Sequence, residues 1–263
     1  MVVDERERGV LLEVAYDGTA FHGWAAQKSA RTVEETLRGA VLAMDPRASE
    51  LRGASRTDAG VHAEGQAVAF DCSRDIPAQG WVLGLNQHLP EDVAVRRARS
   101  IEPGYSPRFS ARTKRYRYRL LIDAVRDPLW SARAWRVTGV DLQAMAVEAL
   151  AARGTHDFAG FRGSADKRPS TMRTLTRVEV EREQGERIVG VVVEGSAFLY
   201  NMVRILVGTM VDVARGRLEQ GATARAIESG NRSDAGTTAP AHGLVLERVD
   251  LVLPEWGGAP WPP

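Results

Sequence analysis

The carboxylate of Asp58 lies in a sequence context that suits chemistry. Segment 53–62 reads GASRTDAGVH, so an arginine, a hydroxyl and a glycine-containing turn flank this side chain. Residues 66–70 then alternate like the start of a strand, and we therefore expect Asp58 to be presented on a loop. There it could attack or deprotonate a substrate. The alternative is an Asx-turn, in which the carboxylate accepts a hydrogen bond from the backbone two residues on.

Two arginines could act with this carboxylate. Arg56 lies two residues before Asp58, so on an extended loop both side chains could point to the same side. Its alternative is a plain surface arginine. Arg204 falls within an apolar helical pattern, where a charge normally has a partner, and we expect that partner to be Asp58. The adjacent guanidinium would keep the carboxylate ionised, whereas the alternative for Arg204 is a boundary residue with its head in water.

Four segments, in this order, resemble the signatures of the TruA family of tRNA pseudouridine synthases. They read YDGTAFHGW (16–24), RTDAGVH (56–62), KRYRY (114–118) and FLYNMVR (198–204). In that family the aspartate of the second segment is the one indispensable catalytic residue, and it corresponds to Asp58. This chain has Ser55 and Ala25 where the family usually has glycine and glutamine. If the usual glycine has a positive φ, Ser55 would be mildly strained.

The resemblance implies a homodimeric enzyme that isomerises uridines 38, 39 and 40 in the anticodon stem-loop of tRNA. The reaction breaks the bond from ribose C1′ to N1 and makes one to C5 without a redox change, so we expect no cofactor. It needs a carboxylate, a polar site for the departing uracil, a base for the C5 proton and a way to extract the nucleotide. Asp58 could attack C1′, attack C6 or remove a sugar proton.

The resemblance also implies roles in substrate binding for two further residues. Arg56 enters the helix space that the flipped base vacates, and its planar guanidinium suits stacking and phosphate contact. Tyr116, rather than Tyr118, corresponds to the tyrosine that stacks on the uracil. Because a phenol with a pKa of about 10 is a poor base at neutral pH, stacking is the expected role of Tyr116. The alternatives are removal of the C5 proton and simple burial between sheet and helix.

Composition limits the classes of protein that the chain can represent. Its 263 residues are 44% hydrophobic and 26% charged, as in globular proteins, and no apolar run approaches the roughly 18 residues of a membrane span. The N-terminus has no apolar signal region, so we expect a cytoplasmic protein. The only cysteine, Cys72, should be a small buried side chain. The five histidines lack ligand spacing, so we expect no metal site, and His62 should be structural or contact RNA.

Positive charge is concentrated between residues 96 and 119, although the net charge of the chain is only +1. Nine basic residues stand there against one acid, Glu102, and aromatic residues are interleaved with them. The basic residues are Arg96, Arg97, Arg99, Arg108, Arg112, Lys114, Arg115, Arg117 and Arg119. This mixture is typical of RNA binding, with a solvated strand face as the alternative.

Two other classes of function fit the sequence less well. A non-catalytic RNA-binding protein could use the 96–119 segment, but it would not need Asp58 together with Arg56 and Tyr116. A sugar-acting hydrolase usually needs two carboxylates that flank the bond, and only Asp58 stands out.

The elements that must position these residues are mixed. Residues 10–16 predict a strand, residues 32–35 a capping box that starts a helix ending at Asp45-Pro46, and residues 93–99 another strand. The second half repeats this plan. Its predicted elements are strands at 115–121, 178–181, 187–193 and 244–252, a helix capped by Asp141, and a long helix over 198–214.

We therefore predict an α+β fold of two similar halves. Residues 1–106 would carry the catalytic Asp loop, and residues 107–263 the Tyr strand and the Arg helix. The resemblance implies the pseudouridine synthase fold, with antiparallel or mixed sheets joined side by side and the active cleft between the halves. The tail from Pro254 should form an irregular strand or fray.

Overall fold

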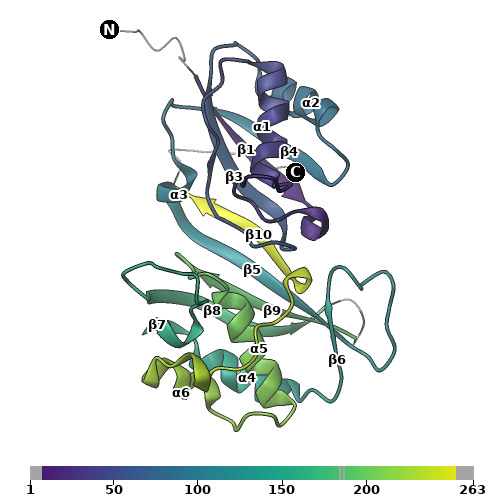
Figure 1. The fold of residues 1–263 in the computed structure, drawn as a ribbon, viewed down its shortest axis with the longest axis vertical. Helices are drawn as coiled ribbons and strands as arrows, with labels where there is room; N and C mark the ends of the chain where they lie inside the picture. The colour runs from purple at the N-terminus through teal and green to yellow at the C-terminus, as the bar shows by residue number, and fades with distance from the viewer. Residues whose placement is uncertain (1–7, 184, 186, 253–263) are drawn as a thin grey trace. The chain divides into compact units, whose positions relative to one another are not determined.

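The computed structural model describes residues 8–183, 185 and 187–252, and its fold is α+β, as predicted (Figure 1). The chain forms two compact units. The first contains the chain up to Arg112 and again from Leu246, and the second contains Thr113–Val245. The sequence placed the joint near residue 106 and all later residues in one half. The chain instead returns to the first unit, because its last strand, β10 (Leu244–Leu251), lies beside a strand of that unit.

The sheet of the first unit has the order β4-β1-β3-β10, and a short strand, β2, pairs with β3. Its other strands are β1 (Arg8–Tyr16), β2 (Arg52–Gly53), β3 (His62–Cys72) and β4 (Val93–Ile101). β1 runs antiparallel to both β3 and β4. Val14, Val68 and Phe70 on these strands are completely buried. The predicted strands at 10–16 and 93–99 are therefore confirmed, each within a slightly longer element.

The helices of the first unit are α1 (Val33–Met44), α2 (Ala78–His88), the short α3 (Pro107–Ser110) and the 3-10 turn η1 (Gly18–Ala20). α1 begins after Thr32 as predicted, but the capping box is wrong because the Thr32 side chain makes no capping hydrogen bond. The first amides of α1 donate to Gly23 O and Trp24 O instead, at 3.2 and 3.0 Å. The sequence did not predict α2, whose Trp81 packs edge-on against Phe70 at 5.2 Å.

The sheet of the second unit has the order β5-β9-β8-β7, with antiparallel neighbours, and the short β6 lies parallel to β5. Its strands are β5 (Ala111–Ile122), β6 (Trp135–Val137), β7 (Gly154–Asp157), β8 (Met172–Arg182) and β9 (Ile188–Gly195). Along β5, Lys114, Tyr116 and Tyr118 are buried while the residues between them are partly exposed. In the predicted turn before β9, Gln184 lies outside the described residues.

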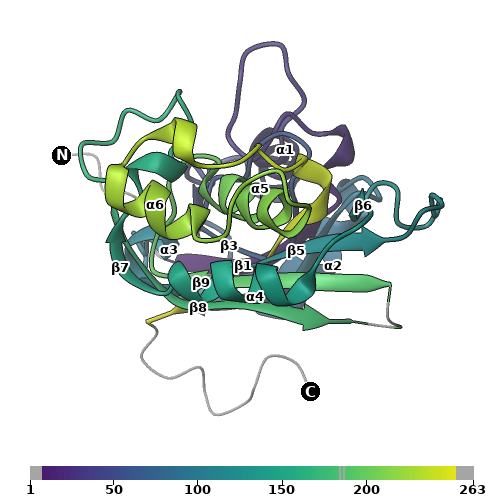
Figure 2. The same ribbon diagram turned by 90° about the horizontal axis from the view of Figure 1, so that it is seen from below.

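Three helices, α4 (Leu142–Ala151), α5 (Met202–Ala214) and α6 (Ala222–Ser229), gather on one side of β7, β8 and β9 (Figures 1 and 2). Asp141 caps α4 as predicted, because its carboxylate accepts from the N–H groups of Gln143 and Ala144. The helix predicted from Phe198 begins only at Met202, since Asn201 has a left-handed conformation with φ 59°. No helix in the described part of the chain is both long and apolar enough to cross a membrane. The predicted tail from Pro254 lies outside the described residues.

Candidate active site

Asp58 begins a tight turn on the loop between β2 and β3. The N–H of Val61 donates to Asp58 O at 3.1 Å, and Gly60 has φ 77°, as the third residue of a type II turn requires. An Asx-turn would direct the N–H of Gly60 at the carboxylate, but this N–H donates to Phe21 O at 3.2 Å. A backbone turn therefore presents the half-buried Asp58 side chain.

Segment 16–24, the first of the four signature segments, packs around this loop. The hydroxyl of Tyr16 lies 2.8 Å from Thr57 Oγ1, and the N–H of Trp24 donates to Thr57 O at 3.0 Å. Gly23 has φ 96°, and a Cβ there would lie 2.8 Å from the same carbonyl oxygen. Thr57, the residue directly before Asp58, is thus held through both its side chain and its backbone.

Gln66, a buried polar residue on β3, fixes the loop on the other side of Arg56. Its amide oxygen accepts from the N–H of Ser55 at 3.2 Å, and its amide nitrogen donates to Ser55 O. Ser55 is not strained, because the only residues other than glycine with a positive φ in the described ranges are Ser29 and Asn201. Arg56 itself is exposed. The sequence offered one sign of this contact, a lone amide in an apolar strand, but no partner for it.

His62 supports the same region through the 3-10 turn η1. Its Nδ1 accepts from the N–H of Gly18 at 3.1 Å, and a Cβ on Gly18 would lie only 2.0 Å from Val61 O. Asp17 Oδ1, 3.2 Å from the same ring nitrogen, also accepts from the N–H of Thr19. This geometry gives His62 a structural role, one of the two that the sequence predicted. The described residues contain no group of three or more His, Cys, Asp or Glu side chains placed to hold a metal ion.

In the second unit, the structure brings the other two signature segments together. The ring of Tyr116, on β5, packs edge-on against Phe198 with 5.0 Å between the ring centroids. Phe198 lies before α5 in a loop that is held by Asp166 and Arg168. Arg168 Nη1 donates to Phe198 O at 2.6 Å, and Asp166 Oδ2 accepts from the N–H of Tyr200 at 2.8 Å. The surroundings of Tyr116 are thus fixed by residues that the sequence did not single out.

The Asp166 carboxylate is itself buried against Arg168. The two side chains approach to 2.7 Å, and the Asp166 side chain is only 2% exposed. Burial alone would raise the pKa of Asp166, but hydrogen bonds from the Arg168 side chain and from the backbone of Tyr200 and Arg168 outweigh it and hold the pKa well below its usual value. The loop that carries Phe198 is therefore held by an ionised carboxylate.

Tyr118 has different surroundings from Tyr116, although both point to the same face of β5. Its ring is completely buried, and its hydroxyl donates to Pro240 O at 2.7 Å. A Cβ on Gly243 would lie 2.6 Å from this ring, so the strand bearing Tyr118 is closely covered. Burial raises the pKa of the Tyr118 phenol, and the charge of Arg204 opposes that rise. Tyr118 is thus enclosed and already hydrogen-bonded.

Arg204 lies in the first turn of α5, and its guanidinium is held by neighbouring residues. Nε donates to Ala239 O at 2.8 Å and Nη1 to Asn201 Oδ1 at 2.8 Å. In return, the N–H of Ala239 donates to Arg204 O at 3.1 Å. Ala239 belongs to residues 235–240, which we call the anchor segment. The predicted partner of Arg204, Asp58, belongs to the first unit, and their pairing remains a prediction.

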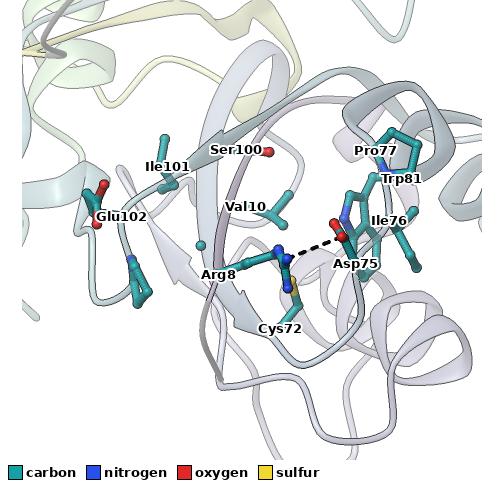
Figure 3. A pocket seen from close by; sticks show the side chains of 12 residues that line it. Arg8, Val10, Cys72, Asp75, Ile76, Pro77, Trp81, Ser100, Ile101 and Glu102 are labelled. Carbon is teal, nitrogen blue, oxygen red and sulfur yellow. Dashed lines mark hydrogen bonds and ion pairs between the residues drawn. The ribbon is translucent and has the colours of Figure 1, made fainter. Parts of the chain in front are cut away.

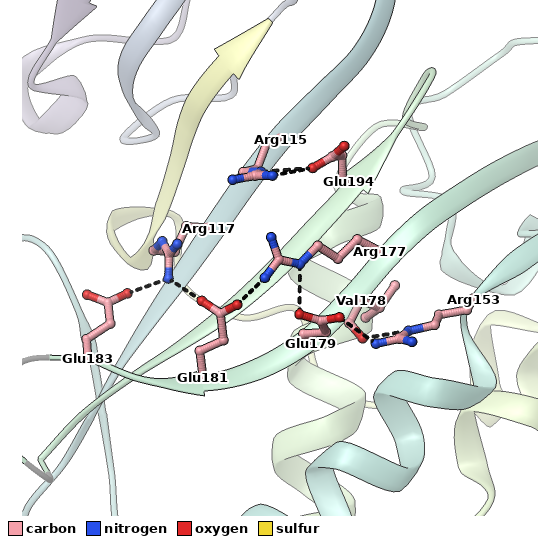
Figure 4. Close-up of polar contacts among 9 residues, drawn as sticks. All are labelled: Arg115, Arg117, Arg153, Arg177, Val178, Glu179, Glu181, Glu183 and Glu194. Carbon is pink, nitrogen blue, oxygen red and sulfur yellow. Dashed lines mark hydrogen bonds and ion pairs between the residues drawn. The ribbon is translucent and has the colours of Figure 1, made fainter. Parts of the chain in front are cut away.

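Three of the nine basic residues in the 96–119 segment pair with glutamates of the second unit, two of them drawn in Figure 4. Arg115 pairs with Glu194 at 2.8 Å, Arg117 with Glu181 and Glu183 at 3.2 and 3.0 Å, and Arg119 with Glu183 at 3.2 Å. These arginines alternate with the buried residues of β5 and lie on its other face. For these three residues the structure agrees with the alternative to RNA binding that the sequence left open, in which they lie on the outer face of a strand. Of the nine basic residues, only Arg96, Arg108 and Arg112 are exposed.

A cavity of about 200 Å³ in the first unit holds none of the four predicted site residues (Figure 3). It is lined by β1, β4 and the segment after β3, and an ion pair between Arg8 and Asp75, 3.2 Å long, lies beside it. Cys72 lines it but is 1% exposed, and burial raises the pKa of its thiol. This confirms the prediction of a small buried cysteine and gives no sign of reactivity.

Comparison with known proteins shows the family of this chain. The profile of a family described as tRNA pseudouridine synthase matches residues 13–110 and 149–250. The chain belongs to this family, whose members are isomerases that convert uridine in tRNA to pseudouridine. Three similar proteins bear the particular name tRNA pseudouridine synthase A.

These relatives match the chain over nearly its whole length. The protein of Acetivibrio thermocellus is 40% identical over 243 residues, which cover 92% of this chain and 99% of the relative. The protein of Citrifermentans bemidjiense is 40% identical over 92% of this chain and 97% of its own. The protein of Geobacter sulfurreducens is 41% identical over 92% of this chain and 99% of its own.

Proposed function

We propose that this protein isomerises uridines 38, 39 and 40 in the anticodon stem-loop of tRNA, with Asp58 as its catalytic residue. One observation carries the assignment of Asp58 beyond family membership. The loop is built to hold this side chain, because segment 16–24 fixes both Thr57 before it, through Tyr16 and Trp24, and the turn after it, through Phe21. A reacting carboxylate needs such preorganisation, whereas a surface aspartate does not.

Asp58 supplies the one charge that the chemistry requires. The carboxylate either attacks the nucleoside or removes a proton from the sugar, so that the bond from C1′ to N1 breaks and the uracil can turn before it is joined through C5. Arg204 is the proposed partner that keeps this carboxylate ionised while substrate excludes water. Its guanidinium is already oriented by Ala239 and Asn201, which supports a positional role.

Arg56 and Tyr116 bind the extruded nucleotide in this proposal. The exposed Arg56 extends from a loop that Gln66 holds at Ser55 and Tyr16 holds at Thr57, which suits a side chain that replaces a base in the RNA stem. Tyr116 stacks on the uracil, and the edge-on contact with Phe198 sets the plane of its ring. Both tyrosine rings are buried, and the family resemblance is what favours Tyr116 over Tyr118 for this role.

The finer assignments rest on the family resemblance. We propose a cytoplasmic homodimer that binds the anticodon stem-loop and needs no cofactor, since the isomerisation involves no redox change. The non-catalytic RNA-binding alternative loses support from the structure of β5, because three arginines of the basic segment are paired with glutamates.

Mapping pseudouridine in unmodified tRNA transcripts tests this function. Three transcripts that carry a single uridine at position 38, 39 or 40 of the stem-loop would be incubated with the purified full-length chain. We expect pseudouridine at each of these positions and none with Asp58→Asn, while this variant still retards tRNA in a binding assay. Product at other positions would refute the proposed site specificity. Product from Asp58→Asn free of wild-type enzyme would refute the role of Asp58.

A further inference from the structure

The anchor segment is attached to α5 by hydrogen bonds at successive turns of the helix. The N–H of Gly236 donates to Thr209 Oγ1 at 2.8 Å, and the N–H of Thr237 donates to Asp212 Oδ2 at 2.8 Å. Both acceptor residues are almost completely buried. A Cβ on Gly208 would lie 1.7 Å from Thr237 O, so glycine is needed for this close approach. The path of the segment along the helix is therefore specified both by side-chain acceptors and by the close approach at Gly208.

At its other end, the anchor segment meets both Arg204 and Tyr118. Ala239 O accepts from Arg204 Nε, and the next carbonyl along the chain, Pro240 O, accepts from the Tyr118 hydroxyl. Proline has no N–H, so no backbone donor holds this residue in place. The phenol thus supplies a fixed point directly after the carbonyl that orients the guanidinium.

From this geometry we infer that Tyr118 is a positioning residue, whose hydroxyl holds Pro240 and so fixes the carbonyl of Ala239, one of the acceptors that orient Arg204. Tyr118 does not touch the substrate in this account. It acts through the adjacent carbonyls of Pro240 and Ala239, and all of these residues lie within the second unit. The inference extends the proposed function, because its effect on catalysis presumes that Arg204 serves Asp58.

Tyr118→Phe tests the inference with little change in shape, since it removes only the hydroxyl. We expect kcat for pseudouridine formation to fall about tenfold with little change in KM, because misplacing a group near the reacting atoms by a fraction of an ångström slows chemistry more than binding. Nuclear magnetic resonance of arginine-labelled protein gives a readout that does not need activity. The Arg204 Nε–H signal, assigned by its absence in Arg204→Lys, should exchange faster with solvent in Tyr118→Phe.

Tyr105→Phe is the matched control, because it removes a phenol that donates to Val252 O at 3.3 Å in the first unit. This variant shows how much Tm changes when one phenol hydrogen bond is lost. Its Arg204 signal should be the same as in the wild type. An unchanged Arg204 signal and unchanged kcat in folded Tyr118→Phe would overturn the inference. Wild-type protein that makes no pseudouridine would instead overturn the proposed function, while the resonance measurement would still decide whether Tyr118 orients Arg204.

Discussion

Tyr116 and Tyr118 differ at the scale of single residues more than their shared strand face suggests. Parity along β5 places both rings on one side, so the spacing of the strand could not separate them and only the family resemblance did. The hydroxyl of Tyr118 is committed to Pro240 O, whereas Tyr116 faces the ring of Phe198. The difference arises from Pro240 and Phe198, which lie in loops distant in sequence, and the residue pattern of the strand does not indicate these partners.

A comparison of Tyr116→Phe with Tyr116→Leu tests the stacking role. Phenylalanine keeps the ring, so we expect most of the activity to remain, while leucine removes the stacking surface. Because stacking on a base contributes about 1–3 kcal/mol, kcat/KM for Tyr116→Leu should fall by roughly one to two orders of magnitude. Steady-state kinetics on a tRNA transcript would measure both. An equal, large loss in the two variants would point to the hydroxyl as the base for the C5 proton.

Gly23 and Gly39 offer a paired test of the loop that holds Asp58. Gly23→Ala would place a Cβ 2.8 Å from Thr57 O at φ 96°, whereas a Cβ on Gly39, inside α1, meets nothing within 4 Å. We expect Gly23→Ala to lower stability by more than about 1 kcal/mol and to reduce kcat. Gly39→Ala should raise stability by about 1 kcal/mol through helix propensity and leave kcat unchanged. Urea denaturation and kinetics of both variants would check this, and a fully active Gly23→Ala would show that Asp58 tolerates a shifted Thr57.

At the scale of elements, the arginines of the basic segment include two sets, one paired with glutamates on β5 and one exposed to solvent. Replacing Arg115 and Arg117 by Gln should leave the salt dependence of tRNA binding almost unchanged, because glutamates already neutralise these residues. Replacing the exposed Arg96, Arg108 and Arg112 should reduce the slope of log affinity against log salt by roughly 0.7–0.9 for each phosphate that the protein no longer neutralises. Binding measured at several salt concentrations would compare the two sets. A larger effect of the first set would mean that RNA displaces the glutamates.

The sequence predicted elements well where local signals agree with the core. Asp141 caps α4, and the strand patterns of β1, β4 and β5 reflect residues that are buried in the sheet. It failed where the tertiary environment decides. Thr32 loses its capping role because Gly23 O and Trp24 O reach the first amides of α1, and the left-handed Asn201 delays the start of α5. The signature singles out Asp58 as the proposed catalytic residue, but no sequence signal singles out Gln66 or Asp166, because both act through hydrogen bonds with distant backbone.

At the scale of the whole molecule, ionisation sets a pH range for stability. The pKa of Asp166 is lowered in the folded state, so its carboxylate contributes fully above its unfolded pKa of about 4, and the contribution is lost as the pH falls further. The pKa values of Cys72 and Tyr118 are raised by burial, so the stability that depends on their neutral forms is lost as the pH rises above about 8.5 and 10. We therefore expect a plateau in Tm between about pH 5 and 8.

Asp166→Asn gives the matched comparison for the acid side. It should lower Tm on the plateau and make Tm fall less steeply below about pH 4, because the titrating group is gone while its shape remains. Thermal melts followed by circular dichroism from about pH 3 to 8 would measure both curves. Parallel curves for the two proteins would assign the acid sensitivity to other carboxylates whose pKa values are lowered, such as Asp45.

The return of the chain to the first unit at Leu246 has a consequence for synthesis on the ribosome. β3 emerges early, but the strand that lies beside it, β10, is the last described strand to be made. Until β10 emerges, an edge of β3 with unpaired backbone groups is available to other nascent chains. The second unit lies between these two strands in sequence and can fold during that interval. A released chain that ends just before β10 should therefore have a second unit that resists protease and a first unit that is sensitive to it.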